Sequence, residues 1–213
     1  MITTRNAGFL GIGACVVFWS GVLIFGALRP SYSHSANTIS ELGALETSNA
    51  ALWNLVGFVV PGLLLAVAGN AIAVSVGSTR SGSHTLARWL LVVSGLAIAG
   101  QGVIPAAMAN GVAVVTSWNT RGHFIMSLIS GIAWIIGALL LAAPMKRNPD
   151  WRGWRTINVA LVLFAVAGVF TLQGTLPDGL AQRIVDAIYF AWFVCMSLRL
   201  VQLGGKRLAA RAT

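Results

Sequence analysis

Three side chains could carry proton chemistry in a chain that is otherwise almost entirely apolar: Glu41, Asp186 and His123. Only 5 of the 213 residues are Asp or Glu, and only 3 are His. A carboxyl group in apolar surroundings has its charged form disfavoured, so it can keep a proton and donate it. We therefore predict catalytic roles for these three residues, with one carboxyl as the acid and His123 or the other carboxylate as the final proton acceptor.

Each of the three also has a structural interpretation, which the sequence leaves open. The segment Thr38-Ile-Ser-Glu41 fits a capping box, in which the glutamate accepts a hydrogen bond from the backbone N–H of Thr38. Arg183 stands three positions before Asp186, which is the spacing of an ion pair across one helical turn. His123 could be a hydrogen-bonded packing residue near the membrane interface.

A second set of polar and aromatic residues could bind an apolar substrate. Within residues 122–143 and 181–203, such residues recur at the i, i+4, i+7 spacing of one helix face. Aromatic rings present the negative side of their π system to a positive charge, as a carbocation intermediate would require. The predicted substrate-binding residues are Asn54, Trp53, Gln101, Trp134, Tyr189, Phe193 and Arg183.

The elements that position these residues are membrane-spanning helices. The chain is 57% hydrophobic and 9% charged, with a mean hydropathy of +0.82, whereas about a quarter of the residues in a soluble domain are charged. Crossing a membrane takes about 20 apolar residues in a helix. Segments of about that length occur at residues 7–28, 51–77, 87–108, 122–143, 156–174 and 181–203. We predict an all-α bundle of six transmembrane helices, forming one domain over residues 1–213, with a short outer-side helix in the first loop.

The basic residues predict the orientation of this bundle. Of the 14 Lys and Arg residues, only Arg29, Arg121 and Arg183 fall on the side of the first loop, and the others fall on the side of the two termini. Because cytoplasmic loops carry the excess of Lys and Arg, both termini should be cytoplasmic. The same clustering between apolar segments argues against a nucleic-acid partner.

Several classes of soluble chemistry find no support in the sequence. There is no P-loop, no Rossmann glycine signature, no HExxH and no Cys/His metal spacing. His34 and His123 could join Glu41 and Asp186 at a metal ion only from separate elements and without diagnostic spacing. We therefore predict no metal and no cofactor.

Five short motifs resemble the bacterial six-helix membrane proteins grouped as DUF998. They are Ile39-Ser-Glu-Leu-Gly-Ala44, Trp53-Asn-Leu-Val-Gly-Phe58, Pro61-Gly62, Gly122-His123 and Gly179-Leu-Ala-Gln-Arg183. The resemblance covers about residues 8 to 202 and implies a six-helix fold with an outer-side polar cluster, in the bacterial plasma membrane. One departure is that Ala106, Ala107 and Met108 follow Pro105, where many members carry an acidic residue. A weaker, architectural similarity is to the membrane-embedded terpene cyclases of meroterpenoid pathways.

Two classes of function fit these observations. The first is an intramembrane enzyme, of the lyase or isomerase type, that uses a carboxyl group to protonate an isoprenoid or other lipidic substrate. The second is non-enzymatic: a small transporter, a lipid-binding protein or a membrane assembly protein whose polar cluster holds the bundle together. In both, the expected partners are membrane lipids and a lipidic or prenylated small molecule, and the sequence carries no signal for an oligomeric state.

Overall fold

In a computed structural model of the chain, six long helices are the main elements of the described residues, which are 2–77, 82–109 and 112–212. All six are long and apolar enough to cross a membrane, which confirms the predicted fold class. Their bounds are α1 Thr4–Ala27, the continuous helix α2 Ala50–Trp53, η2 Asn54–Val59 and α3 Val60–Val76, α4 Gly82–Val103, α5 Trp118–Arg147, η3 Arg152–Trp154 with α6 Arg155–Leu172, and α7 Asp178–Ala212.

All six spans differ from their predicted bounds. The sixth was expected at 181–203, but α7 runs over Asp178–Ala212, and the third and fourth spans differ at both ends. The third was expected at 87–108, but α4 ends at Val103, because a proline at position 105 disfavours helix in the residue before it. The fourth was expected to begin at 122, but α5 begins at Trp118. Its first turn is polar, so the hydropathy of the sequence did not mark that turn as part of the helix. Between α4 and α5 lies a small antiparallel pair that the sequence did not predict, β1 Met108–Ala109 and β2 Val112–Ala113.

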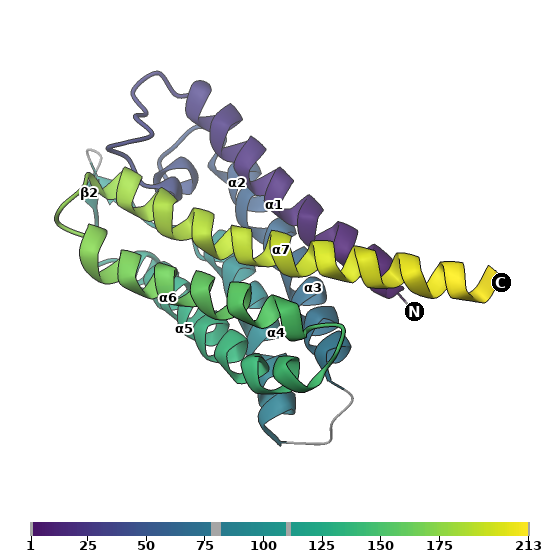
Figure 1. Cartoon of the computed structure of the whole chain (residues 1–213). Helices are drawn as coiled ribbons and strands as arrows, with labels where there is room; N and C mark the ends of the chain where they lie inside the picture. The colour runs from purple at the N-terminus through teal and green to yellow at the C-terminus, as the bar shows by residue number, and fades with distance from the viewer. Residues whose placement is uncertain (1, 78–81, 110–111, 213) are drawn as a thin grey trace.

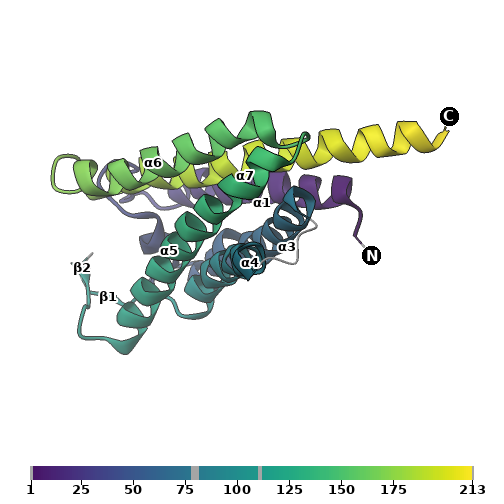
Figure 2. The same ribbon diagram turned by 60° about the horizontal axis from the view of Figure 1, so that its bottom comes forward.

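Both termini lie at one end of the bundle, which we call the terminal end (Figure 1). The opposite end, which we call the loop end, carries residues 28–49, the β1–β2 pair and the turn between α6 and α7. Helix α7 packs between α1 and α6, while α3 packs between α1 and α4, and α5 packs mainly on α4. Figure 2 shows that α5 diverges from α6 and α7 towards the loop end.

Glycines bring α3 and α4 into backbone contact. A Cβ atom on Gly62 would lie 2.4 Å from the backbone N of Ala99, and one on Gly95 would lie 2.4 Å from that of Ala66. Helices in membranes associate through such small residues, because lipid offers no hydrophobic driving force and close packing must replace it. These contacts fix the frame against which the other helices pack.

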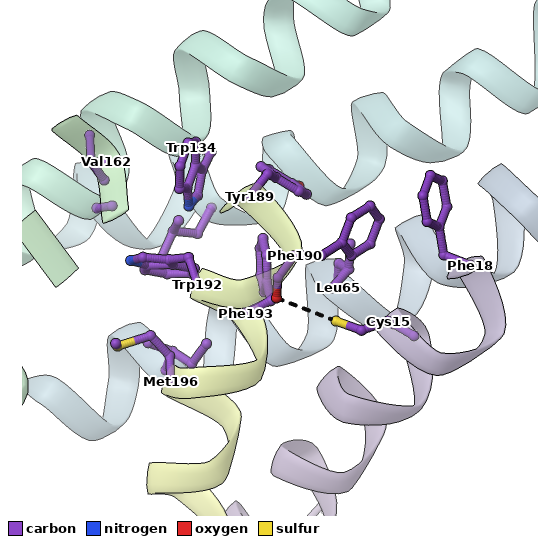
Figure 3. Close-up of a cluster of buried hydrophobic side chains, with 14 of the residues drawn as sticks. Cys15, Phe18, Leu65, Trp134, Val162, Tyr189, Phe190, Trp192, Phe193 and Met196 are labelled. Carbon is purple, nitrogen blue, oxygen red and sulfur yellow. Dashed lines mark hydrogen bonds between the residues drawn. The ribbon is translucent and has the colours of Figure 1, made fainter. Parts of the chain in front are cut away.

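Aromatic side chains fill the centre of the bundle, between α1, α5 and α7 (Figure 3). The Phe18 and Phe190 rings stack with their centroids 4.2 Å apart. Below them, the indole N–H of Trp192 donates to Asn158 Oδ1 at 2.7 Å, and Asn158 Nδ2 donates to the backbone carbonyl of Ala138 at 2.9 Å. Asn158 therefore links α6 to both α7 and α5, and both the oxygen and the nitrogen of its side-chain amide have a hydrogen-bond partner.

The first loop holds η1, a single 3-10 turn over Ile39–Gly43. We expected a short helix lying at the outer surface, but Ile39 and Leu42 are only 1% and 3% exposed. The two apolar residues are three positions apart, so a 3-10 turn places both on one side, against the bundle. The loop is thus packed into the fold rather than resting on it.

The second span changes its hydrogen-bond spacing near its start. Residues Asn54–Val59 form a π-helix, and the N–H of Val60 donates to the carbonyl of Leu55. Pro61 follows directly and has no N–H to continue an α-helical ladder. The π segment holds Asn54 and Phe58, both buried, where the loop meets the bundle.

Candidate functional site

Glu41 points back at the loop rather than into the bundle. Its Oε1 accepts from the backbone N–H of Thr38 at 2.7 Å and from the hydroxyl of Thr38 at 3.0 Å. Its Oε2 accepts from Asn37 Nδ2 at 2.7 Å. The glutamate half of the predicted capping box is therefore present, and three donors hold the carboxylate in place.

Arg183 fastens the same loop to the start of α7. Its Nη1 donates to the carbonyl of Asn37 and to that of Gly179, each at 2.8 Å. Its Nη2 donates to the hydroxyl of Tyr32 and lies 3.3 Å from Nδ1 of His34. We call Tyr32, His34, Asn37 and Arg183 the clasp.

The loop also satisfies free backbone groups at the start of α7. The N–H of Leu180 donates to the carbonyl of Ser35 at 2.9 Å, and that of Gly179 donates to Ala36 at 3.3 Å. The first N–H groups of a helix have no partner within the helix, so these carbonyls replace a side-chain cap. A Cβ atom at position 179 would lie 2.3 Å from the carbonyl oxygen of Asn37, so this approach requires glycine.

Tyr32 remains protonated within the clasp. Burial raises the pKa of its hydroxyl above the ordinary value, while the charge and hydrogen bond of Arg183 oppose that shift. The hydroxyl donates to the carbonyl of Thr38 at 3.0 Å and accepts from Arg183. The guanidinium also lies over the tyrosine ring, with its Cζ 5.5 Å from the ring centroid.

His123 joins α5 to the end of α4. Its Nδ1 lies 3.1 Å from the backbone carbonyls of both Gln101 and Ile104, and its ring contacts that of Phe58 with centroids 5.7 Å apart. Since both neighbours of Nδ1 are carbonyl oxygens, Nδ1 carries the proton. The Gln101 backbone, rather than its side chain, makes this contact.

Trp53 and Asn54 form the floor under η1. The indole of Trp53 is 0% exposed and lies where a Cβ on Gly43 or Gly57 would come within 2.7 Å of it. Asn54 Nδ2 donates to the carbonyl of Gly43 at 2.8 Å, while its buried Oδ1 has no partner among the described residues. Both side chains therefore anchor the loop to the π segment.

Asp186 differs from Glu41 and His123 in its surroundings. It is partly exposed, and its carboxyl makes no hydrogen bond or ion pair with any described residue. Asp186 does not form the predicted ion pair with Arg183, because the guanidinium is directed at the loop carbonyls and at Tyr32. Asp186 shares one face of α7 with Tyr189 and Phe193, at i+3 and i+7.

A short hydrogen-bonded chain begins one turn below Asp186. The Tyr189 hydroxyl lies 3.0 Å from Oγ of Ser94 on α4, which lies 3.3 Å from Oγ of Ser130 on α5. Figure 3 shows Trp134 beside Tyr189, and their ring centroids are 5.1 Å apart. The buried indole N–H of Trp134 has no partner among the described residues.

The loop-end half of α5 carries several exposed side chains. Phe124, Ile125 and Leu128 are 53%, 53% and 63% exposed, and Ser127 is exposed as well. This agrees with the divergence of α5 from α6 and α7 in Figure 2. Of the α5 stripe predicted from the sequence, His123, Ser130 and Trp134 are buried, whereas Ser127 is not.

The predicted site residues therefore form three groups rather than one pocket. Glu41 lies in the loop, and Arg183 binds that loop from α7. Trp53, Asn54, Gln101 and His123 lie around Phe58 and η1. Asp186, Tyr189 and Phe193 share a face of α7, where the Tyr189 ring contacts Trp134 of α5. Two surface grooves on the described part of the chain, one around Asn70 and Arg88 and one around Arg155 and Thr156, are lined by none of the predicted site residues. No three His, Cys, Asp or Glu side chains in that part of the chain come together in a way that could hold a metal ion.

The motifs that frame these groups recur in a known family. The profile of DUF998, a family described as proteins of unknown function, matches residues 12–199. The chain belongs to the DUF998 family. Neither a curated protein nor a solved structure matches it.

The family match spans the helices that carry all three groups in this DUF998 protein. The predicted site residues did not include Tyr32 or Asn37, although these two complete the clasp around Arg183. The available signal was an arginine just inside the start of an apolar helix, where its five donors need acceptors. In the structure, the first loop supplies them through Tyr32 and the carbonyl of Asn37.

Proposed function

We propose that this DUF998 membrane protein is an intramembrane enzyme that acts by acid/base chemistry on an isoprenoid or other lipidic substrate, with Asp186 as the acid. One observation carries the proposal. Of the predicted catalytic residues, Asp186 alone keeps a side chain with no bond to the described residues, while Glu41 and His123 are bonded to backbone groups. Ionisable residues within membrane spans mark functional sites by default, and pairing is the common alternative to function.

The surroundings of Asp186 suit an apolar substrate. The exposed side chains of Phe124, Ile125 and Leu128 on α5 face the hydrocarbon phase, from which we expect a lipidic molecule to approach. The rings of Tyr189 and Phe193, with centroids 5.2 Å apart, follow Asp186 along α7. These supply the few polar groups and apolar walls that small-molecule sites combine.

The proposed reaction balances without water, oxidant or cofactor. The Asp186 carboxyl gives its proton to an alkene carbon or an epoxide oxygen, and the substrate becomes a carbocation or an opened epoxide with a hydroxyl group. An internal double bond attacks the cationic carbon and forms a ring. The Asp186 carboxylate then takes a proton from the carbon next to the new cation, which restores both a double bond and the acid. The net change is an isomerisation, of the kind that a terpene cyclase of meroterpenoid pathways performs.

The test compares variants in membranes supplied with prenylated quinols and their terminal epoxides. Wild type should form isomers of unchanged mass, Asp186→Asn should lower their formation at least about 100-fold, and Glu41→Gln should leave it within a few-fold of wild type. Unchanged product formation in Asp186→Asn, with both proteins folded, would remove the proposed acid.

The proposed setting is the bacterial plasma membrane, with both termini in the cytoplasm. The support is the distribution of the basic residues, which lie mostly at the terminal end. A fluorescent protein fused after residue 213 should fluoresce in cells, whereas an export-dependent reporter at the same place should be inactive.

A non-enzymatic role is the second candidate, and the clasp favours it. Glu41, Arg183, Asn54 and His123 each form hydrogen bonds with backbone groups of this chain. Such bonding is what a transporter, lipid-binding or membrane assembly protein needs to hold its bundle together. If Asp186→Asn lowers thermal stability in detergent and no substrate is turned over, this candidate replaces the enzyme.

A further inference from the structure

A groove of about 960 Å³ lies at the terminal end, on the opposite half of the bundle from Asp186. Its floor is the face of α3 around Asn70 and Val74, and its walls are the first turns of α1 and the part of α4 that holds Arg88 and Trp89. No residue of the three groups described above lines it. The groove is therefore a separate feature of the bundle.

The groove offers hydrogen-bond donors without matching acceptors. Arg88 Nε donates to Asn70 Oδ1 at 2.6 Å, which uses the one strong acceptor of that amide. The two terminal nitrogens of Arg88 and the Nδ2 of Asn70 donate to no acceptor among the described residues. A guanidinium with two free N–H₂ groups matches the geometry of a phosphate or carboxylate.

The depth of these donors fits the boundary between headgroups and hydrocarbon. Asn70 lies six residues before the end of α3 and Arg88 six residues after the start of α4, which is about 9 Å along each helix. Trp89 is exposed beside them, and the Arg88 guanidinium lies 5.6 Å from its ring centroid. Tryptophan is typical of membrane interfaces. Towards the bilayer centre the groove continues along apolar Ala66 and Val67.

The charges around the groove favour an anion. Asp150 is the acidic residue of the terminal end, and it lies 3.6 Å from Arg199, in an ion pair. The first turn of α1, which borders the groove at Thr3 and Thr4, carries no acidic residue. Its free N–H groups add a partial positive charge.

We propose that this groove binds the headgroup of an anionic phospholipid of the phosphatidylglycerol type, from the leaflet at the terminal end. The phosphate takes the free donors of Arg88 and Asn70, and the start of one acyl chain follows the apolar face of α3. This site is separate from the proposed enzymatic site and stands whether or not Asp186 is catalytic.

Native mass spectrometry of the full-length protein in detergent tests the proposal, with phosphatidylglycerol and phosphatidylcholine of the same acyl chains as probes. Wild type should bind phosphatidylglycerol at least about tenfold more tightly than phosphatidylcholine. Arg88→Gln should weaken phosphatidylglycerol binding about tenfold, as the loss of a charge-assisted hydrogen bond does. The matched control is Arg152→Gln, which removes one exposed charge from the same end outside the groove and should bind like wild type.

A second variant keeps the charges and fills the space. Val74 is 51% exposed, so Val74→Trp can place its ring in the groove without entering the core, and it should also weaken phosphatidylglycerol binding. Equal binding of the two lipids by wild type, equal loss in Arg88→Gln and Arg152→Gln, or undiminished binding by Val74→Trp would each overturn the proposal. Displacement of the lipid by an equal concentration of inorganic phosphate would also overturn it, because the site would then recognise the free anion.

Discussion

Arg183, one turn into α7, donates through Nη1 to the backbone carbonyl of Asn37, 146 positions earlier in the chain, at 2.8 Å. The same guanidinium holds the carbonyl of Gly179 and contacts Tyr32 and His34. One side chain thus joins the first loop to the last helix. This explains how a loop of about twenty polar and small residues is packed against an apolar bundle.

Replacing Arg183 by Gln should loosen the first loop. The carbonyls of Asn37 and Gly179 lose a charged donor, at a cost of about 2 kcal/mol, which corresponds to a fall in Tm of about 5 °C for a chain of this size. Arg183→Lys should not restore stability, because an ammonium group cannot reach several acceptors in the fixed fork of a guanidinium. Thermal unfolding in detergent measures both, and a Lys variant as stable as wild type would contradict the clasp.

Gly179→Ala should destabilise the same junction by a steric route. Its Cβ atom would lie 2.3 Å from the carbonyl oxygen of Asn37, a backbone atom that cannot move without shifting the loop. We expect a cost of about 1 to 3 kcal/mol. Gly131→Ala is the matched control, since a Cβ there meets nothing within 4 Å and should be neutral or slightly stabilising. Equal stability of the two variants would show that the loop does not press on α7.

Glu41→Gln should lower stability without removing any activity. The carboxylate accepts from the N–H and hydroxyl of Thr38 and from Asn37 Nδ2, and an amide would turn an N–H₂ group towards one of these donors. The expected loss is about 1 to 2 kcal/mol. Glu46→Gln is the comparison, because Glu46 is exposed and accepts a single backbone bond from Met108. Product formation that disappears in Glu41→Gln, with stability unchanged, would return Glu41 to the catalytic residues.

Tyr32 predicts a pH dependence of stability in the alkaline range. Burial raises the pKa of Tyr32 above its ordinary value of 10.0, so the folded protein holds this proton more tightly than the unfolded chain does. The stability that comes from this difference is complete below pH 10 and is lost as pH rises through the folded pKa. Between pH 8 and pH 11 the Tm of wild type should therefore fall further than that of Tyr32→Phe. Parallel curves would show that the hydroxyl is not held as described.

The sequence predicted the bundle because transmembrane spans follow from length and hydropathy alone. The capping box was also readable, since Thr38 and Glu41 are neighbours in the chain and their bond is local. The clasp could not be predicted from the sequence, because Arg183 contacts Asn37 only when α7 packs along α1. Contacts between distant segments depend on how the helices pack, which hydropathy does not encode.

The sequence predicted which residues could form the candidate site, but it did not predict how these residues are arranged relative to one another. Asp186, Tyr189 and Phe193 lie on one face of α7, as helical periodicity requires. Their separation from His123 was not predictable, because it depends on three phenylalanine rings. Phe58 contacts His123, Phe18 contacts Phe58, and Phe190, which stacks on Phe18, contacts Tyr189. Helical periodicity predicts which residues share a face of a helix, but it does not predict which side chains of other helices pack against that face.

Labelling with a lipid-soluble carbodiimide tests the central role of Asp186 most directly, because such reagents reach carboxyl groups from the hydrocarbon phase. Mass spectrometry of treated membranes should find the adduct on Asp186 and not on Glu41, whose oxygens are occupied by Thr38 and Asn37. A prenylated substrate added first should slow the labelling of Asp186. Labelling of Glu41 with Asp186 unmodified would contradict the account, because the reactive carboxyl would then lie in the loop.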